Sequence, residues 1–275
     1  MASNPLQQYF RQPKIYINLP SKGIFMPQGS LQGDSTNIPI YGMTGMDEIM
    51  MKTPDALLTG TSTVKVIESC CPQIKDAWAV SNIDIDCLLA AIRIATYGNT
   101  MEVEHVCSNC ETDNTYPIDI SGILDHFTRA QYDNEIVLGD FKIYIKPLNY
   151  KMSSEFAQRN FAIGQQMNQL TSLTDEEEKK IKTSELFEQL ARLQNDIFVE
   201  GIDSVEIKGK SVTEHAYIKE WLENSDVTIF DQIKKQITKN QDAWLTPQYD
   251  MLCENCQHTD KVRIGLDQSN FFGNA

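Results

Sequence analysis

The chain contains two copies of the pattern Cys-x-Asn-Cys, one at residues 107–110 and one at residues 253–256. Aligned on the first cysteine, both copies are followed at the same offsets by an alternating apolar stretch, which is typical of a strand. Each copy therefore predicts a zinc knuckle that leads into a strand. A metal ion shared by the two copies would join parts of the chain that lie far apart in sequence.

The spacing suits a tetrathiolate site. A tetrahedral zinc ion with Zn–S bonds of about 2.3 Å takes two thiolates from one tight turn, because two intervening residues allow both sulfurs to point inward. Two such turns in register predict a single structural zinc ion with no open coordination position. The expected ligands are Cys107, Cys110, Cys253 and Cys256.

Three other interpretations of the cysteines stay open at this point. The cysteines could be buried and reduced without a metal. They could form a redox pair, although neither pattern opens a helix after a strand, which is the setting that lowers a thiol pKa in redox motifs. His105 or His258, which flank the knuckles, could replace one sulfur.

A shared zinc ion requires the C-terminal segment to return to an earlier part of the chain. We therefore expect a discontinuous core domain made of residues 1–150 and 241–275, with a mostly helical insertion at residues 151–240. The expected fold class is α+β, with a core of mixed helix and antiparallel strand that carries a two-knuckle zinc ribbon.

The core segment shows alternating strand patterns and short helical patterns. Pro39 and Gly139-Asp140 mark an edge strand and a hairpin turn, and Gly98 stands where a left-handed residue would end a helix. The predicted elements are a strand over 14–19, an edge strand over 38–41, a helix that starts after Thr44, a helix over 84–95 and a hairpin over 135–146.

The insertion shows two long helical stripes. A capping box from Thr174 to Glu177 marks the start of the second helix. The stripes consist of Phe156, Ile163, Met167 and Leu170 in the first helix, and of Leu186, Leu190, Leu193 and Ile197 in the second. A small hairpin over 205–212 and helical patterns over 216–222 and 229–237 are expected to follow.

Composition excludes several classes of function. The formal net charge is −14, and residues 101–120 contain no lysine or arginine. Because phosphate contacts require basic side chains, we expect no nucleic-acid binding through the first knuckle. No apolar run approaches the roughly 20 residues that span a bilayer, and no signal-peptide pattern opens the chain, so we expect no membrane insertion. Seven cysteines, an odd number, suit a reducing compartment.

Catalytic motifs of the common hydrolases are missing. The sequence has neither HExxH nor GxSxG, and its four histidines are scattered. Gly209-Lys210-Ser211 resembles the end of a phosphate-binding loop, but Ser204 stands where that motif requires its first glycine. A hairpin turn explains this tripeptide better, and we expect no enzyme activity.

Candidate partner contacts lie in the 20–37 loop and at Phe271 and Phe272 near the C-terminus. Exposed aromatic residues near a chain end often dock on other proteins. The alternative is that these two phenylalanines close the core beside the second knuckle.

Several stretches resemble a known family. They are Leu19-Pro-Ser-Lys-Gly23, the block from Met43 to Gly60, and the block from Ile83 to Gly98 with Cys107-x-x-Cys110 after it. Over residues 15–125 the chain resembles the baseplate hub or hub-assembly proteins of T4-like contractile-tailed phages.

The resemblance implies a protein without enzyme activity that acts through contacts with other baseplate or hub proteins. Its expected locations are the host cell cytoplasm during assembly and, if the protein is retained, the tail baseplate of the virion. It could be a hub subunit or a hub-assembly chaperone. The alternative is a zinc-ribbon adaptor of a transcription or replication complex, which would favour a basic surface that this chain lacks. An enzyme ranks third.

Overall fold

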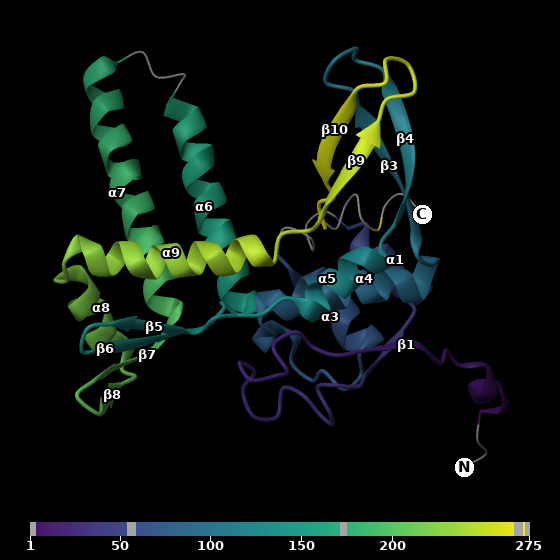
Figure 1. The fold of residues 1–275 in the computed structure, drawn as a ribbon, viewed down its shortest axis with the longest axis horizontal. Helices are drawn as coiled ribbons and strands as arrows, with labels where there is room; N and C mark the ends of the chain where they lie inside the picture. Colours follow the sequence, from purple (N-terminus) through teal and green to yellow (C-terminus); the bar gives the residue numbers. More distant parts are fainter. Residues whose placement is uncertain (1–3, 54–58, 171–174, 267–271, 273–275) are drawn as a thin grey trace. The chain divides into compact units, whose positions relative to one another are not determined.

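The computed structural model describes residues 4–53, 59–170, 175–266 and 272. The chain divides into two compact units, of which the first comprises Met1–Ala130 with Trp244–Ala275 and the second Gln131–Ala243. Both units mix helices with antiparallel strands, as predicted (Figure 1). None of the described helices combines the length and apolarity needed to cross a membrane.

The first unit contains helices and three two-stranded antiparallel ribbons, two of which extend together away from the helices (Figure 1). Its elements are η1 (Pro5–Tyr9), β1 (Pro13–Ile17), β2 (Ile38–Tyr41), α1 (Gly45–Met51), α3 (Thr61–Cys70), η2 (Ala77–Ala79), α4 (Asn82–Tyr97), β3 (Thr100–Val106), β4 (Asp113–Asp119), α5 (Ser121–Arg129), β9 (Gln248–Leu252) and β10 (Thr259–Arg263).

Helix α4 lies at the centre of the first unit. Apolar side chains such as Leu88 and Ile92 are fully buried, and the helix packs against β1, β2, α3 and α5. Gly98 ends the helix with a φ of 91°, a conformation that an L side chain rarely adopts. The predicted helix and its stop signal are thus both present.

The other predicted elements of this unit also form. Strands β1 and β2 pair in antiparallel fashion, with Ile17 opposite Ile38. Thr44 caps α1 in a capping box with Asp47, because each side chain accepts the backbone N–H of the other residue.

The second unit is built on a four-stranded antiparallel sheet in the order β5-β6-β7-β8. Nonpolar residues of the sheet, including Ile143 and Ile202, pack with Ile218, Leu222 and Ile233 from two helices. The elements are β5 (Glu135–Leu138), β6 (Phe141–Ile145), α6 (Tyr150–Leu170), α7 (Glu176–Glu200), β7 (Ile202–Ile207), β8 (Lys210–Val212), α8 (His215–Glu223) and α9 (Val227–Ala243).

Two boundaries of the compact units differ from the sequence expectation. The hairpin over 135–146 forms as predicted, but β6 pairs along its length with β7, which lies beyond α7. Because backbone pairing joins this hairpin to the later strand, it belongs to the second unit. The division therefore falls after residue 130 instead of residue 150, and the returning segment begins at 244 instead of 241.

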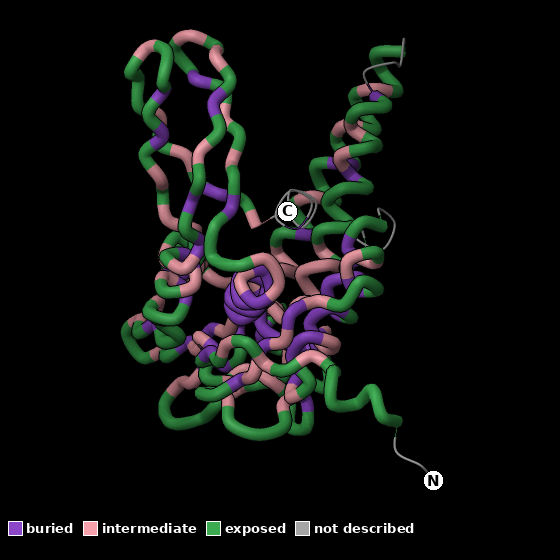
Figure 2. Tube along the Cα trace, turned by 90° about the vertical axis from the view of Figure 1, so that its right-hand side faces the viewer, coloured by how far each residue is buried: buried purple, intermediate pink, exposed green. Residues whose placement is uncertain are grey.

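Helices α6 and α7 form an antiparallel pair with a core of their own, and in Figure 2 buried positions recur along the helices between exposed ones. The N-terminal cap of α7 is Asp175, whose carboxylate accepts the N–H groups of Glu177 and Glu178. Thr174, the predicted capping residue, lies outside the described residues.

Candidate metal centre

Two hairpin turns present the predicted cysteines. The first turn joins β3 to β4 and the second joins β9 to β10 (Figure 1). In each turn the residue after the second cysteine adopts a left-handed conformation, with φ of 55° at Glu111 and 60° at Gln257. Their N–H groups donate to the carbonyl oxygens of Cys107 and Cys253, both at 3.0 Å. The two turns thus share one backbone design.

A second backbone hydrogen bond closes each turn. The Cys107 N–H donates to the Thr112 carbonyl at 3.0 Å, and the Cys253 N–H donates to the His258 carbonyl at 2.8 Å. Both bonds lie at the point where the strands separate, so they fix the position of the first cysteine of each pair.

The four thiols converge. Their sulfur atoms all lie within 4.8 Å of one another, and the Cys107–Cys256 and Cys110–Cys253 sulfur pairs are each 3.6 Å apart. A tetrahedron of sulfur ligands at about 2.3 Å from an ion has edges of about 3.8 Å. The cluster could therefore hold a metal ion, and it joins all four predicted ligands.

Asparagine amides surround the sulfurs. The Asn109 side-chain amide donates to Cys256 Sγ at 3.5 Å, and the Asn255 amide donates to Cys110 Sγ at 3.7 Å. The repeated asparagine of the sequence pattern therefore reaches across to the opposite turn in both directions. Such donors stabilise sulfur in its anionic form.

The thiol pKa values differ within the cluster. Hydrogen bonding to the side chain and backbone of Thr112 lowers the pKa of Cys110 to about 6. The Cys256 backbone N–H is the main cause of a lowered pKa at Cys253. The Asn109 backbone N–H favours the Cys107 thiolate, but burial and the neighbouring thiols raise the pKa of Cys107 to about 11.

Neither flanking histidine lies in the sulfur cluster of the described residues. His105 Nε2 lies 2.9 Å from Asp260 Oδ2, and His258 Nε2 lies 3.4 Å from Asp260 Oδ1. The Ser108 hydroxyl and N–H also bind Asp260, and they are the largest causes of its strongly lowered pKa. Asp260 joins the two hairpins, and the sequence analysis did not identify it.

The other three cysteines are free thiols. Cys70, Cys71 and Cys87 are buried in the first unit and form no disulfide. Burial raises the pKa of Cys70 to about 12 and also raises the pKa of Cys71 and Cys87. Neutral, buried thiols of this kind behave as small apolar side chains.

The two C-terminal phenylalanines differ in what the structure describes. Phe272 is 2% exposed. This burial favours the interpretation that its ring closes the core, and it disfavours a docking role for this residue. Phe271 lies outside the described residues.

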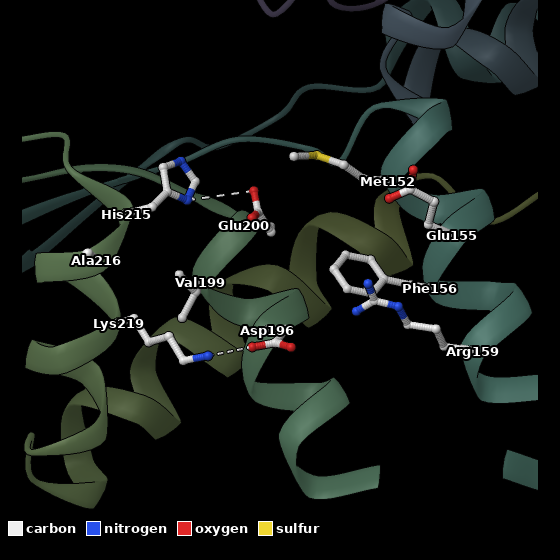
Figure 3. A pocket seen from close by; sticks show the side chains of 10 residues that line it. All are labelled: Met152, Glu155, Phe156, Arg159, Asp196, Val199, Glu200, His215, Ala216 and Lys219. Carbon is white, nitrogen blue, oxygen red and sulfur yellow. Dashed lines mark hydrogen bonds and ion pairs between the residues drawn. The ribbon is translucent and has the colours of Figure 1, made fainter. Parts of the chain in front are cut away.

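A cavity of about 370 Å³ lies in the second unit between α6, α7 and α8 (Figure 3). Four of its ionisable groups lie in two close pairs: Lys219 Nζ lies 2.9 Å from Asp196 Oδ1, and His215 Nδ1 lies 3.6 Å from Glu200 Oε2. The ten lining residues drawn in Figure 3 include no serine, threonine or cysteine. The sequence analysis did not identify this cavity.

Comparison with known proteins gives one family. A family model described as T4 bacteriophage base plate protein matches residues 45–273, a span that includes both cysteine turns and the whole second unit. No curated protein and no solved structure matches the chain.

Proposed function

The chain belongs to the T4 bacteriophage base plate protein family, and we propose that it acts without catalysis, either as a subunit of the base plate hub or as a chaperone that assembles the hub. The observation that carries the proposal is the extent of the match, which runs through both units. The resemblance to hub and hub-assembly proteins over residues 15–125 supports the same role.

The four-thiol cluster supports a structural zinc ion in this role. Four thiolates complete a tetrahedral site and leave no coordination position for a substrate. Structural zinc contributes about 10–16 kcal/mol of apparent binding free energy in small zinc peptides, which is comparable with the whole stability of a domain. In this chain the ion would hold β9 and β10 to β3 and β4, and so return the C-terminal segment to the first unit.

Partners in this role are other base plate or hub proteins. The protein would meet them in the host cytoplasm during assembly and, as a subunit, remain in the virion tail.

The alternative role as a zinc-ribbon adaptor of transcription or replication is less well supported. Glu102, Glu104 and Asp113 are exposed on the β3–β4 ribbon, and that ribbon has no lysine or arginine. An acidic ribbon repels a phosphate backbone.

Quantitative mass spectrometry of purified tails tests the proposal. Tails of a phage that encodes this chain are compared with total protein from infected cells, using the other base plate proteins as internal standards. A fixed copy number in tails identifies a hub subunit. Absence from tails, combined with abundance in infected cells and association with base plate intermediates, identifies an assembly chaperone. Association with a polymerase and with no base plate component would contradict both roles.

A further inference from the structure

The cavity between α6, α7 and α8 is lined by ionisable side chains in two layers. On each helix, two lining residues stand four positions apart, which is about one helical turn. Each helix therefore contributes one residue to each end of the cavity. The three pairs are Glu155 and Arg159 on α6, Asp196 and Glu200 on α7, and His215 and Lys219 on α8.

Two contacts show which residues of α7 and α8 share a layer. Lys219 Nζ lies 2.9 Å from Asp196 Oδ1 at one end of the cavity. At the other end, His215 Nδ1 lies 3.6 Å from Glu200 Oε2. We name the two ends the Asp196 layer and the Glu200 layer, after their residues on α7.

Helix α6 adds one residue to each layer. It runs antiparallel to α7, and Figure 3 shows Glu155 on the side of Glu200 and Arg159 on the side of Asp196. The Asp196 layer thus has two cations, Arg159 and Lys219, beside one carboxylate. The Glu200 layer has two carboxylates and, besides its histidine, no basic side chain. The negative charge of the lining is therefore concentrated at one end.

The two glutamates of the Glu200 layer have unused acceptors. In the part of the chain that the structure describes, no ion pair includes Glu155. His215 Nδ1 is buried and makes no hydrogen bond there, so it donates none to Glu200. Glu200 is also the last residue of α7, where the partial negative charge of the helix end repels a carboxylate. This end of the cavity therefore attracts a positive group.

Apolar side chains complete the lining. Val199 is 4% exposed, and Met152 and Phe156 are half-buried. The Arg159 guanidinium carbon lies 5.9 Å from the centre of the Phe156 ring, so this cation rests beside the ring and not between the two glutamates. The volume of about 370 Å³ lies in the range of small-ligand sites.

We propose that the cavity binds an organic cation on an apolar stem. The guanidinium or ammonium group would lie between Glu155 and Glu200, where carboxylates accept charge-assisted hydrogen bonds, and the stem would pack on Met152, Phe156 and Val199. Three carboxylates and two permanent cations line the cavity, so one added positive charge balances the lining. A lysine or arginine side chain of another protein and a free small cation share this chemistry. The site does not depend on the function proposed above.

Methionine-methyl NMR of the full-length protein tests the site, with n-butylguanidinium as the probe and n-butylurea as its uncharged isostere. The Met152 signal is assigned by its loss in Met152→Leu. At constant ionic strength, n-butylguanidinium should shift this signal with saturation. The same shift with n-butylurea should require an about ten-fold higher concentration, because the bonds between charged groups are lost. The other methionine signals report that the chain is folded.

Variants without one negative charge locate the bound cation. Glu155→Gln and Glu200→Gln should each weaken n-butylguanidinium binding several-fold. The control is Glu185→Gln, which makes the same change at an exposed position of α7, about 22 Å along the helix from Glu200, and should leave binding unchanged. The proposal would be overturned by the absence of a saturating shift, by equal binding of n-butylurea, or by an equal effect of all three variants.

Blocked tripeptides distinguish the two sources of the cation. Acetyl-Gly-Arg-Gly-amide presents the same guanidinium on a peptide backbone, and the matching citrulline peptide lacks the charge. Saturation by the arginine peptide at concentrations similar to those of n-butylguanidinium would assign the site to a basic side chain of another protein. Binding of n-butylguanidinium with exclusion of the peptide would assign it to a free small cation. Equal binding of the arginine and citrulline peptides would contradict recognition by charge.

Discussion

Ser21 holds Asp84 through two of its polar groups. Its backbone N–H donates to Asp84 Oδ1 at 2.9 Å, and its hydroxyl donates to Oδ2. The Ser81 hydroxyl also donates to Oδ2, at 2.8 Å. All three side chains are buried, so Asp84 ties the turn after β1 to the first turn of α4.

Replacement of Asp84 by alanine should destabilise the first unit. The change leaves three buried donors without an acceptor, and each such group costs about 1–3 kcal/mol. Removal of the buried carboxylate also removes its unfavourable desolvation, which offsets part of this cost. We therefore expect the free energy of unfolding to fall by about 2–3 kcal/mol. Hydrogen exchange of the α4 amides measures the loss within that unit. The control is Asp125→Ala, because the Asp125 side chain is 66% exposed; an equal loss there would contradict the assignment.

Asp86 gives the first unit a defined pH dependence. Burial raises the pKa of this half-buried carboxyl from 3.8 to about 6. Between these two values the folded state retains a proton that the unfolded chain has released, so stability falls as the pH rises and the loss is complete above about pH 6. The shift corresponds to at most about 3 kcal/mol, and partial solvation reduces it to about 1–2 kcal/mol.

Asp86→Asn should therefore be more stable than the parent at pH 7, with the difference shrinking to near zero at about pH 4. Denaturation curves of parent and variant at several pH values measure this difference. Asp84 also has a raised pKa. Because Asp84 is present in both proteins, its contribution to the pH dependence of stability cancels in the difference. A difference that is constant with pH would show that Asp86 does not titrate as described.

Removal of the proposed zinc ion should release the C-terminal hairpin. We expect about one equivalent of zinc per chain in the purified protein by elemental analysis, and loss of it in Cys110→Ser and Cys253→Ser. Hydrogen exchange of β9 and β10 should then accelerate, while the second unit keeps its protection because it contains none of the four cysteines.

His105→Ala and His258→Ala are the matched controls for zinc binding. Each residue contacts Asp260 and not the sulfur cluster, so both variants should retain the metal. Loss of zinc in either variant would restore the interpretation that a histidine is a ligand. If β9 and β10 kept their protection from hydrogen exchange in a chain without metal, hydrogen bonds alone would be sufficient to hold this hairpin against β3 and β4.

Patterns that depend on local periodicity were predictable from the sequence. The two apolar stripes of the insertion, from Phe156 to Leu170 and from Leu186 to Ile197, are the residues that pack between α6 and α7. The four cysteines were predictable for a similar reason, because a tight turn fixes the spacing of two ligands. In both cases each helix or turn is recognisable from one short stretch of sequence.

Features that depend on partners distant in sequence were not predictable. The hairpin over 135–146 belongs to the second unit because β6 pairs with β7, which lies on the far side of two long helices. Asp260 binds His105 and Ser108 across the two ribbons. A single sequence does not specify which strands pair or which side chain a buried charge meets.

The α6–α7 pair allows a sharp test of its separate core. Leu193 is 6% exposed and packs with Ile163, Leu170 and Leu186, so Leu193→Ala should cost about 2–4 kcal/mol through lost burial and a residual cavity. Phe187 on the same helix is 60% exposed, and Phe187→Ala should change stability by no more than about 0.5 kcal/mol. Hydrogen exchange resolved by peptide measures both changes.

The location of the change matters as much as its size. The sheet of the second unit packs in a different cluster, around Ile143, Ile202 and Ile233. Leu193→Ala should therefore accelerate exchange in α6 and α7 and leave β6 and β7 protected, because the sheet keeps all of its own buried contacts. Equal acceleration in the sheet would show that the two clusters unfold as one cooperative unit. A large effect of Phe187→Ala would instead show that its exposed ring already contacts another molecule, such as a second copy of the chain.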